Sequence, residues 1–303
     1  SIGLATLKPG YGNFAQLLSQ ADAACFTAKE LGGNRVCLSE GSTAIHNQTV
    51  SMKTANLIKQ ALSHNYFELV CQDIMPLTDK TNEGRYFEVL LRLRDPQSGL
   101  LLSPNSFIPV AERFNLGVKM DQHVINQLLT WMENHPQQAN SVAACSINLS
   151  AASMNDEHFA EYLQHRLNHS SFPANKIIFE ITETSAMQDL ASAQALIRTF
   201  RQIGCRFALD DFGSGFCSFS YLQNLDVDIF KIDGSFVRNL ETSELSKAVI
   251  RSITDIARVL NKTTTAEHCE SLELIKLLKK LGVDQAQGYG IHKPQDINEY
   301  FKV

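Results

Sequence analysis

The chain has 303 residues, of which 44% are hydrophobic and 19% are charged, and its formal net charge at pH 7 is -5. This composition is typical of a globular protein with a full core. The negative charge argues against a protein that holds long nucleic acid by its backbone, because such proteins carry a basic face. The charge does not exclude a protein that binds a small phosphate ligand through a few local groups and metal ions.

The first predicted elements form a small α/β segment. Apolar residues recur at helical spacing over residues 13–31, and Gly32-Gly33-Asn34 ends this predicted helix. Residues 35–38 predict a short strand. The polar, non-periodic residues 41–52 predict a linker, and a second helix is expected over residues 51–63.

From residue 67 onward, short strand-like runs alternate with amphipathic helices. The predicted strands are 67–74, 86–93, 142–149, 176–181, 206–209, 229–232, 263–266 and 286–291. The helices between most of them are 120–133, 156–168, 190–203, 245–260 and 272–281. Eight strands alternating with helices predict a (β/α)8 TIM-like barrel. A doubly wound open sheet is the alternative, weakened by the high strand count and the lack of a G-x-G-x-x-G after the first strand.

The first connection between strands, residues 75–85, is polar and too short for a helix. We therefore expect the barrel to be irregular at its first strand. The predicted fold class is α/β, with a small N-terminal α/β fragment at 1–40, a linker at 41–52 and the barrel at 53–303.

Polar residues stand in or after successive predicted strands. They are Glu88, Asn148, Glu180, Glu183, Asp210, Asp211, Lys231, Asp233, Glu267, Glu270 and Gln287. A single acid at a strand end is usually a helix N-cap or a solvated loop residue. The carboxyl ends of barrel strands converge on one face, which carries the active site, so a whole series of such residues predicts a site there.

Convergence of so many carboxylates is repulsive unless cations neutralise it. Carboxylate and amide oxygens suit Mg²⁺ or Mn²⁺. The adjacent Asp210 and Asp211 would let one carboxylate bridge two metals while its neighbour holds the second. Two metals about 3.5–4 Å apart form a clamp for attack on a phosphodiester. These residues therefore indicate metal-assisted phosphoryl hydrolysis on a barrel.

Seven blocks of the sequence resemble, in order, the signatures of the EAL domain family of cyclic di-GMP phosphodiesterases, over about residues 55–300. They are Glu88-Val89-Leu90-Leu91-Arg92, Ile147-Asn148-Leu149-Ser150, Glu180-Ile181-Thr182-Glu183, Asp210-Asp211-Phe212-Gly213-Ser214-Gly215-Phe216, Lys231-Ile232-Asp233, Ala266-Glu267-His268-Cys269-Glu270, and Gln287-Gly288-Tyr289 through Lys293-Pro294. A lone E-x-L would carry no weight, whereas seven blocks in order are specific.

The resemblance implies the hydrolysis of cyclic di-GMP to linear pGpG. It implies two metal ions per site, Mg²⁺ or Mn²⁺, with Ca²⁺ expected to inhibit. The implied metal ligands are Glu88, Asn148, Glu180 and Asp210 for one ion and Asp210, Asp211 and Glu267 for the second.

The resemblance also implies roles around the metals. Lys231 would orient the attacking water or stabilise developing charge, and Glu267 would be the base or the anchor of that water; Glu88 completes the implied catalytic set. The residues implied to bind the substrate are Gln72 at a guanine, Arg92 at a phosphate, Asp233, and Gln287 on the nucleophile side.

Two further implications concern assembly and domain organisation. Glu183 would anchor the loop 211–219, and a homodimer would form through the barrel by this loop and a neighbouring helix. Residues 1–40 resemble the C-terminal end of a GGDEF domain, without the G-G-D-E-F loop, so this fragment cannot make cyclic di-GMP.

Several positions depart from the family pattern, and Val89, His268 and Cys269 are the ones nearest to implied metal ligands. Val89 replaces the central alanine of E-A-L and would crowd the site if it pointed into the barrel, whereas pointing outward it would do nothing. His268 and Cys269 replace the more usual Gly-Val. We expect His268 to face solvent; the alternatives are that it tunes Glu267 or competes for metal.

The leading hypothesis is an active phosphodiesterase, because each implied catalytic position holds the expected residue type. The alternative is a receptor that binds cyclic di-GMP without cleaving it, and a third is a scaffold that binds no nucleotide. No contact with long nucleic acid is expected.

The cellular location is predicted from the spacing of the cysteines and from the length of the apolar stretches. The seven cysteines are scattered with no C-x-x-C pair, which is typical of reduced thiols in a cytosolic protein. No stretch approaches the ~18 apolar residues of a membrane span, and no signal peptide is visible. We expect a cytoplasmic location without membrane contact by this chain, although upstream segments of a parent protein could anchor it in a membrane.

Overall fold

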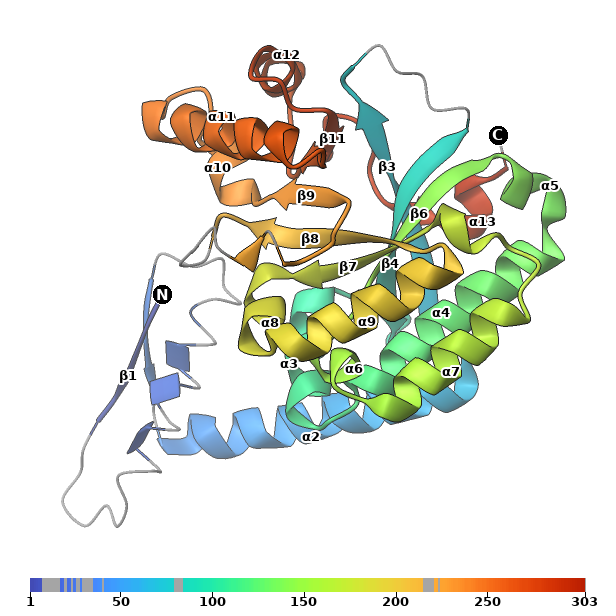
Figure 1. Cartoon of the computed structure of the whole chain (residues 1–303). Helices are drawn as coiled ribbons and strands as arrows, with labels where there is room; N and C mark the ends of the chain where they lie inside the picture. The colour runs from blue at the N-terminus through green and yellow to red at the C-terminus, as the bar shows by residue number, and fades with distance from the viewer. Residues whose placement is uncertain are drawn as a thin grey trace. The chain divides into compact units, whose positions relative to one another are not determined.

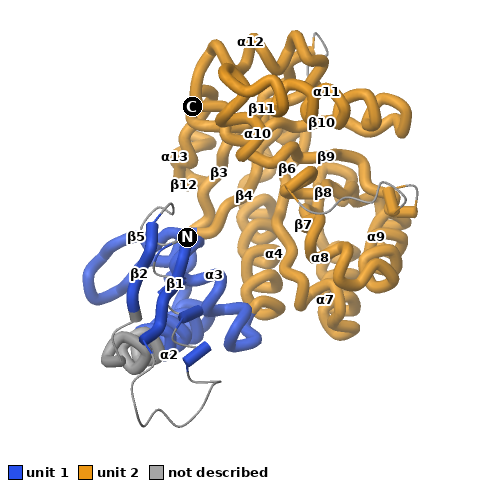
Figure 2. The backbone as a smooth tube through the Cα atoms, turned by 90° about the vertical axis from the view of Figure 1, so that its left-hand side faces the viewer, with its two compact units in different colours: residues 1–67, 92–116 blue, residues 68–91, 117–303 orange. Residues whose placement is uncertain are grey.

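The computed structural model describes residues 1–6, 17–18, 21–22, 24–25, 28, 35–39, 41–78, 84–214, 221–222 and 224–302. The chain divides into two compact units, coloured separately in Figure 2: residues 1–67 with 92–116, and residues 68–91 with 117–303. None of the described helices combines the length and the apolar character that crossing a bilayer requires.

The first unit holds a parallel pair of strands and two longer helices. Strand β1 (Ile2–Ala5) pairs in parallel with β2 (Val36–Ser39). Helix α2 (Gly41–His64) contacts α3 (Pro104–Arg113), and the two-residue strand β5 (Leu101–Leu102) precedes α3. Described residues 17–18, 21–22, 24–25 and 28 are helical, and the rest of the helix predicted at 13–31 lies outside the described residues.

The second unit is a closed barrel of eight strands (Figure 1). Its strands are β3 (Phe67–Pro76), β4 (Arg85–Arg94), β6 (Val142–Asn148), β7 (Ile177–Thr182), β8 (Arg206–Phe212), β9 (Ile229–Ile232), β10 (Thr263–Ala266) and β11 (Gln285–Gln287), with the short β12 (Gln295–Asp296) added beside β3. The order of hydrogen-bonded neighbours is β3-β11-β10-β9-β8-β7-β6-β4, and β4 pairs again with β3. The predicted barrel is confirmed.

The barrel is irregular at its first strand, as expected. Strands β4 and β6 to β11 pair in parallel, whereas β3 pairs antiparallel with β11. The connection from β3 to β4 has too few residues for a crossover helix, so β3 must run opposite to β4.

The helices of the second unit are amphipathic and bury one face against the barrel. The longer ones are α4 (Gly117–Asn134), α7 (Glu157–Asn168), α9 (Leu190–Ile203), α11 (Glu244–Val259) and α12 (Leu272–Lys280). The shorter ones are α5 (Pro136–Asn140), α6 (Ala151–Met154), α8 (Glu183–Gln188), α10 (Gly234–Arg238) and α13 (Ile297–Tyr300), and a 3-10 turn (Ala174–Lys176) precedes β7.

The strands alternate between two environments, because successive side chains point to opposite faces. One face forms an apolar layer inside the barrel, made of Ile74, Tyr86, Ala144, Ile178, Ala208 and Ile229. A polar layer lies next to it on the same face and is made of Gln72, Glu88, Ser146, Glu180, Asp210 and Lys231. Each polar residue stands two positions after its apolar counterpart, except in the antiparallel strand β3, where Gln72 stands two positions before Ile74. The opposite faces join the main core that packs against the helices. The polar layer therefore has an apolar layer directly beneath it.

Two predicted boundaries were wrong. Helix α2 begins at Gly41 rather than at residue 51. Residues 41–50 are mostly polar in the sequence, so hydrophobic periodicity gave no signal for the start of this helix, and a linker role for residues 41–52 stays a prediction. The predicted strand 286–291 ends early, because β11 stops at Gln287. A Cβ at Gly288 would lie 2.2 Å from the Cys269 nitrogen, so only glycine permits the close turn that follows.

A bidentate ion pair joins α4 to α7. The two terminal nitrogens of Arg166 donate to Glu133 Oε1 and Oε2 at 2.8 and 3.0 Å, and the hydrogen bonds from Arg166 lower the pKa of Glu133. Glu133→Gln is expected to lower the free energy of unfolding at neutral pH by about 1–2 kcal/mol. Because the folded pKa lies below the usual value, this difference is present above pH about 4.5 and shrinks as the pH falls through the folded pKa.

Urea unfolding of wild type and Glu133→Gln at pH 7 and at steps down to pH 4 measures this difference. Glu244→Gln is the matched control, because Glu244 forms its ion pair with Lys247 on the surface, where its side chain is 87% exposed. An equal loss in both variants would contradict the prediction.

Candidate active site

Lys231 lies among four carboxylates in the polar layer. Its side chain is 2% exposed, and its Nζ lies 2.5 Å from Glu180 Oε2, 2.7 Å from Glu267 Oε1, 3.1 Å from Asp210 Oδ1 and 3.5 Å from Glu88 Oε2. Burial alone would lower the pKa of Lys231, but the surrounding carboxylates hold it well above its usual value. Lys231 is therefore a permanent positive charge at the centre of the site.

The carboxylates around this lysine carry more negative charge than it neutralises. Burial raises the pKa of Glu267 to about 8, with Lys231 opposing the rise and Asp210 adding to it. Burial, and then the charge of Asp210, raise the pKa of Asp211 to about 6. Burial also raises the pKa of Glu180 well above its usual value. The site is short of positive charge, which a divalent cation would supply.

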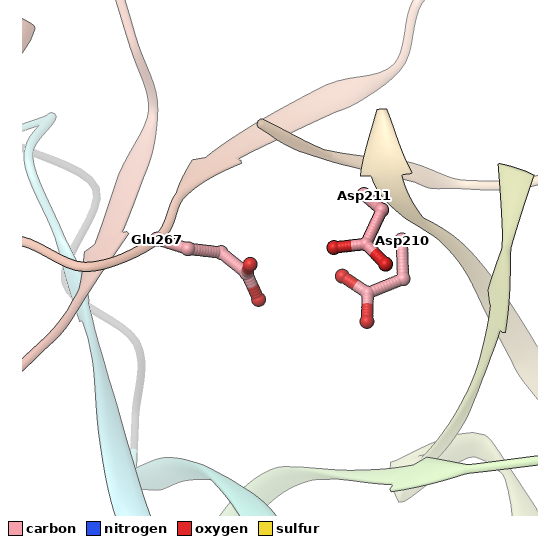
Figure 3. A group of neighbouring side chains, drawn as sticks. All are labelled: Asp210, Asp211 and Glu267. Atoms are coloured by element: carbon pink, nitrogen blue, oxygen red, sulfur yellow. The ribbon is translucent and has the colours of Figure 1, made fainter. Parts of the chain in front are cut away.

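The residues fit such a cation. One oxygen each from Asp210, Asp211 and Glu267 lie within 4.8 Å of one another, and their carboxylates face a common space (Figure 3). Glu180 Oε1 and Asp210 Oδ1 are buried and have no hydrogen-bond partner within the described part of the chain. Asp210 Oδ1 lies at ion-pair distance from Lys231. Buried carboxylate oxygens without partners are a donor set that Mg²⁺ or Mn²⁺ prefers.

Two side-chain amides orient Glu88. Asn148 Nδ2 donates to Glu88 Oε1 at 2.6 Å, and Gln287 Nε2 donates to Glu88 Oε2 at 2.7 Å. An ionised carboxylate only accepts hydrogen bonds, so the amide nitrogens must face it and the amide oxygens must turn away. Gln287 Oε1 is buried with no partner among the described residues. The oxygen of each amide is therefore turned away from Glu88.

Gln72 supports this arrangement from β3. Its side chain is buried; its Nε2 donates to the His292 carbonyl at 2.9 Å, and its Oε1 accepts from Gln287 Nε2 at 3.1 Å. Both ends of the amide are thus engaged inside the protein, in a chain of hydrogen bonds that reaches Glu88 through Gln287. Contact of Gln72 with a guanine stays a prediction.

Asp211 and Asp233 flank the acidic cluster. Asp211 has φ +54°, in the left-handed region that residues other than glycine rarely adopt, and the neighbouring carboxyl of Asp233 contributes to the raised pKa of Asp211. Asp233 also accepts a hydrogen bond from the Ser235 nitrogen at 2.8 Å, as the N-cap of α10. Its contact with substrate stays a prediction.

Glu183 is buried outside the lysine-centred cluster. Its Oε2 accepts from the Gly213 nitrogen at 2.9 Å and its Oε1 accepts from the Tyr221 hydroxyl at 2.7 Å. These bonds hold the chain on both sides of residues 215–220. Those residues, which include most of the loop expected to mediate dimerisation, lie outside the described residues.

Arg92 lies four residues after Glu88 in β4, on the part of the strand that belongs to the first unit. Its contact with a substrate phosphate stays a prediction.

Sequence patterns did not single out two residues that position the site. Asp121 of α4 accepts hydrogen bonds from the backbone nitrogen and the hydroxyl of Ser150, just after the strand that carries Asn148. Tyr221 holds Glu183. Ser150, at the end of Ile147-Asn148-Leu149-Ser150, could have indicated that a hydrogen-bond acceptor such as Asp121 lies nearby. No sequence feature near Tyr221 indicated its contact with Glu183.

Val89 faces away from the polar layer that contains Glu88. It is 3% exposed and belongs to the core between the barrel and its helices, whereas Glu88 points into the polar layer. Of the two orientations considered for Val89, the outward one is observed.

Val89→Ala, which restores the usual family residue, is therefore expected to lower stability without raising turnover. Loss of two buried methyl groups costs about 2 kcal/mol. Urea unfolding and a turnover assay on the same preparation measure both quantities. A gain in kcat with unchanged stability would place Val89 in the site instead.

The comparisons with known proteins agree with this geometry. The family model of the EAL domain matches residues 55–294. The chain is 38% identical over 301 residues to cyclic di-GMP phosphodiesterase PdeB of Shewanella oneidensis, covering 99% of this chain and 35% of that protein. It is 37% identical over 243 residues to cyclic di-GMP phosphodiesterase PdeF of Escherichia coli, covering 80% of this chain and 32% of that protein.

Among solved structures, the EAL domain of FimX from Pseudomonas aeruginosa bound to c-di-GMP superposes with a TM-score of 0.73 at 27% identity, covering 80% of this chain and 96% of that one. The present chain spans about a third of the length of the two curated relatives.

Proposed function

This chain belongs to the EAL domain family, and from that premise we propose that it hydrolyses cyclic di-GMP to linear pGpG in a metal-dependent reaction. The observation that supports the proposal most directly is the buried cluster of carboxylates around Lys231, with acceptor oxygens left unpaired. Relatives that match 80–99% of the chain are named as cyclic di-GMP phosphodiesterases.

The proposed cofactor is Mg²⁺ or Mn²⁺, with two ions per site and inhibition by Ca²⁺. The residues that would hold the ions are Glu88, Asn148, Glu180, Asp210, Asp211 and Glu267. When bound, such ions polarise a phosphoryl oxygen and make water a stronger nucleophile near neutral pH.

The chain's own residues supply orientation and charge. Water adds to phosphorus, the bond from phosphorus to the 3′ oxygen breaks, and that oxygen leaves with a proton. Glu267 accepts the proton of the attacking water, because its carboxylate lies in the acidic cluster with Asp210 and Asp211. Lys231 stabilises the negative charge that develops on phosphate oxygens, because its Nζ is fixed and desolvated.

Finer features of the proposal rest on the family resemblance. Residues 1–40 would be the end of a GGDEF domain, a reading supported by the parallel strands β1 and β2. The same proposal includes substrate contacts by four residues, Gln72, Arg92, Asp233 and Gln287. It also includes dimerisation through the barrel, tolerance of the E-V-L signature and a cytoplasmic location.

The experiment is incubation of the purified chain with cyclic di-GMP and Mg²⁺ or Mn²⁺, followed by chromatography, with a parallel binding titration in Ca²⁺. Formation of pGpG that stops with a chelator is the expected result. Tight binding without product would support a cyclic di-GMP receptor in place of the enzyme. If the chain neither binds cyclic di-GMP nor forms product, the proposal for this chain is overturned.

A further inference from the structure

His268 follows the cluster residue Glu267 and adopts an unusual backbone conformation. Its φ is +53°, in the left-handed region that glycine enters freely and a ring-bearing residue rarely does. The family resemblance places glycine at this position. Strained conformations of this kind concentrate at functional sites, so an observed outlier is a reason to ask what the side chain does.

The imidazole ring of His268 packs against the chain at Gly234. A Cβ at Gly234 would lie 2.1 Å from His268 Cδ2 and 2.7 Å from Cγ, so the ring occupies the space that a side chain there would need. Gly234 is buried, while His268 remains exposed. The ring therefore lies against the backbone at Gly234, and the residue keeps contact with solvent.

This ring lies at the end of the barrel that carries the site. Glu267 contributes an oxygen to the acidic cluster, and adjacent Cα atoms are about 3.8 Å apart. Gly234 follows Asp233, whose carboxyl acts electrostatically on the cluster residue Asp211. His268 is itself absent from the group of candidate metal ligands among the described residues. The expectation that His268 is exposed holds, but its ring is packed rather than free.

We propose that His268 is a stacking platform for one guanine of cyclic di-GMP, and thus a specificity residue for the base beside the scissile phosphate. The inference rests on the proposed function. Aromatic rings that are already ordered bind base faces well, because little side-chain freedom is lost on binding. A free surface histidine would explain neither the left-handed backbone nor the packing on Gly234.

The test measures the Kd of cyclic di-GMP in Ca²⁺ for wild type, His268→Gly, His268→Asn and His268→Tyr. Glycine relaxes the backbone and asparagine tolerates the left-handed region, so both remove the ring without adding strain. Both are expected to weaken binding about 5- to 100-fold, the range of one base–aromatic stack. His268→Tyr, which keeps a ring, is expected to restore most of the affinity.

A second readout separates base recognition from a structural effect. With Mn²⁺, kcat/KM for cyclic di-GMP is expected to fall by a larger factor in the glycine and asparagine variants than kcat/KM for bis(p-nitrophenyl) phosphate, a diester without bases. The loss should appear mainly as a higher KM. Equal losses on both substrates, or wild-type affinity in both variants, would overturn the platform.

The wild-type titration distinguishes the two proposals. If wild type does not bind cyclic di-GMP, the proposed function fails and this inference fails with it. If wild type binds and the ring-less variants bind equally well, only the platform fails.

Discussion

Lys231→Met is expected to lower kcat for cyclic di-GMP by about 10²- to 10³-fold, the cost of removing one fixed electrostatic group from a desolvated site. The ammonium group is 2% exposed and lies within 3.5 Å of four carboxylates. Methionine keeps the length and the apolar stem of the lysine side chain but cannot neutralise the four carboxylates. The carboxylates would then take up protons or hold a cation less favourably placed for the reaction.

Steady-state kinetics measures this loss, and thermal unfolding with and without Mg²⁺ shows whether the fold persists. Lys247→Met is the matched control, because Lys247 pairs with one glutamate on the surface of α11, away from the cluster. We expect the control to keep wild-type kcat. Wild-type turnover in Lys231→Met would show that the lysine has no role in the reaction.

Glu88→Ala is expected to bring hydrolysis below detection while leaving the barrel folded. Glu88 is the common partner of Asn148 and Gln287, so its loss removes one implied metal ligand and frees two amides that carry oxygen acceptors. Metal affinity should fall as well, because ligands and their hydrogen-bonded partners together fix the coordination geometry.

Product chromatography measures the hydrolysis, Mn²⁺ titration measures metal affinity, and circular dichroism checks the fold. Glu161→Ala, at an α7 position whose side chain is 80% exposed, is the control. Retained turnover with unchanged Mn²⁺ affinity would show that Glu88 is not a metal ligand.

Much of the fold was accessible from hydrophobic periodicity. The strands of the barrel are short Val-, Ile- and Phe-rich runs, and their carboxyl ends carry the polar residues, so both the barrel and the cluster followed from one pattern. Glu180, Asp210 and Lys231 stand two residues beyond Ile178, Ala208 and Ile229 on the same faces, which is why the cluster forms a layer.

Other features depend on contacts between distant residues. The chain of hydrogen bonds from the His292 carbonyl through Gln72 to Gln287 joins positions 215 to 220 residues apart, which no local pattern encodes. The orientation of Val89 needed the register of β4, since a shift by one residue would have turned it inward. The start of α2 was missed because a polar helix has no periodic signal.

The apolar layer next to the cluster has a consequence for how substrate would reach the carboxylates and how product would leave them. An apolar layer lies next to the carboxylates inside the barrel and is made of Ile74, Tyr86, Ala144, Ile178, Ala208 and Ile229. We therefore expect ions, substrate and water to reach the carboxylates from the side opposite this layer, and pGpG to leave by the same side. Turnover is therefore expected to slow as pGpG accumulates, since product still on that side excludes the next cyclic di-GMP.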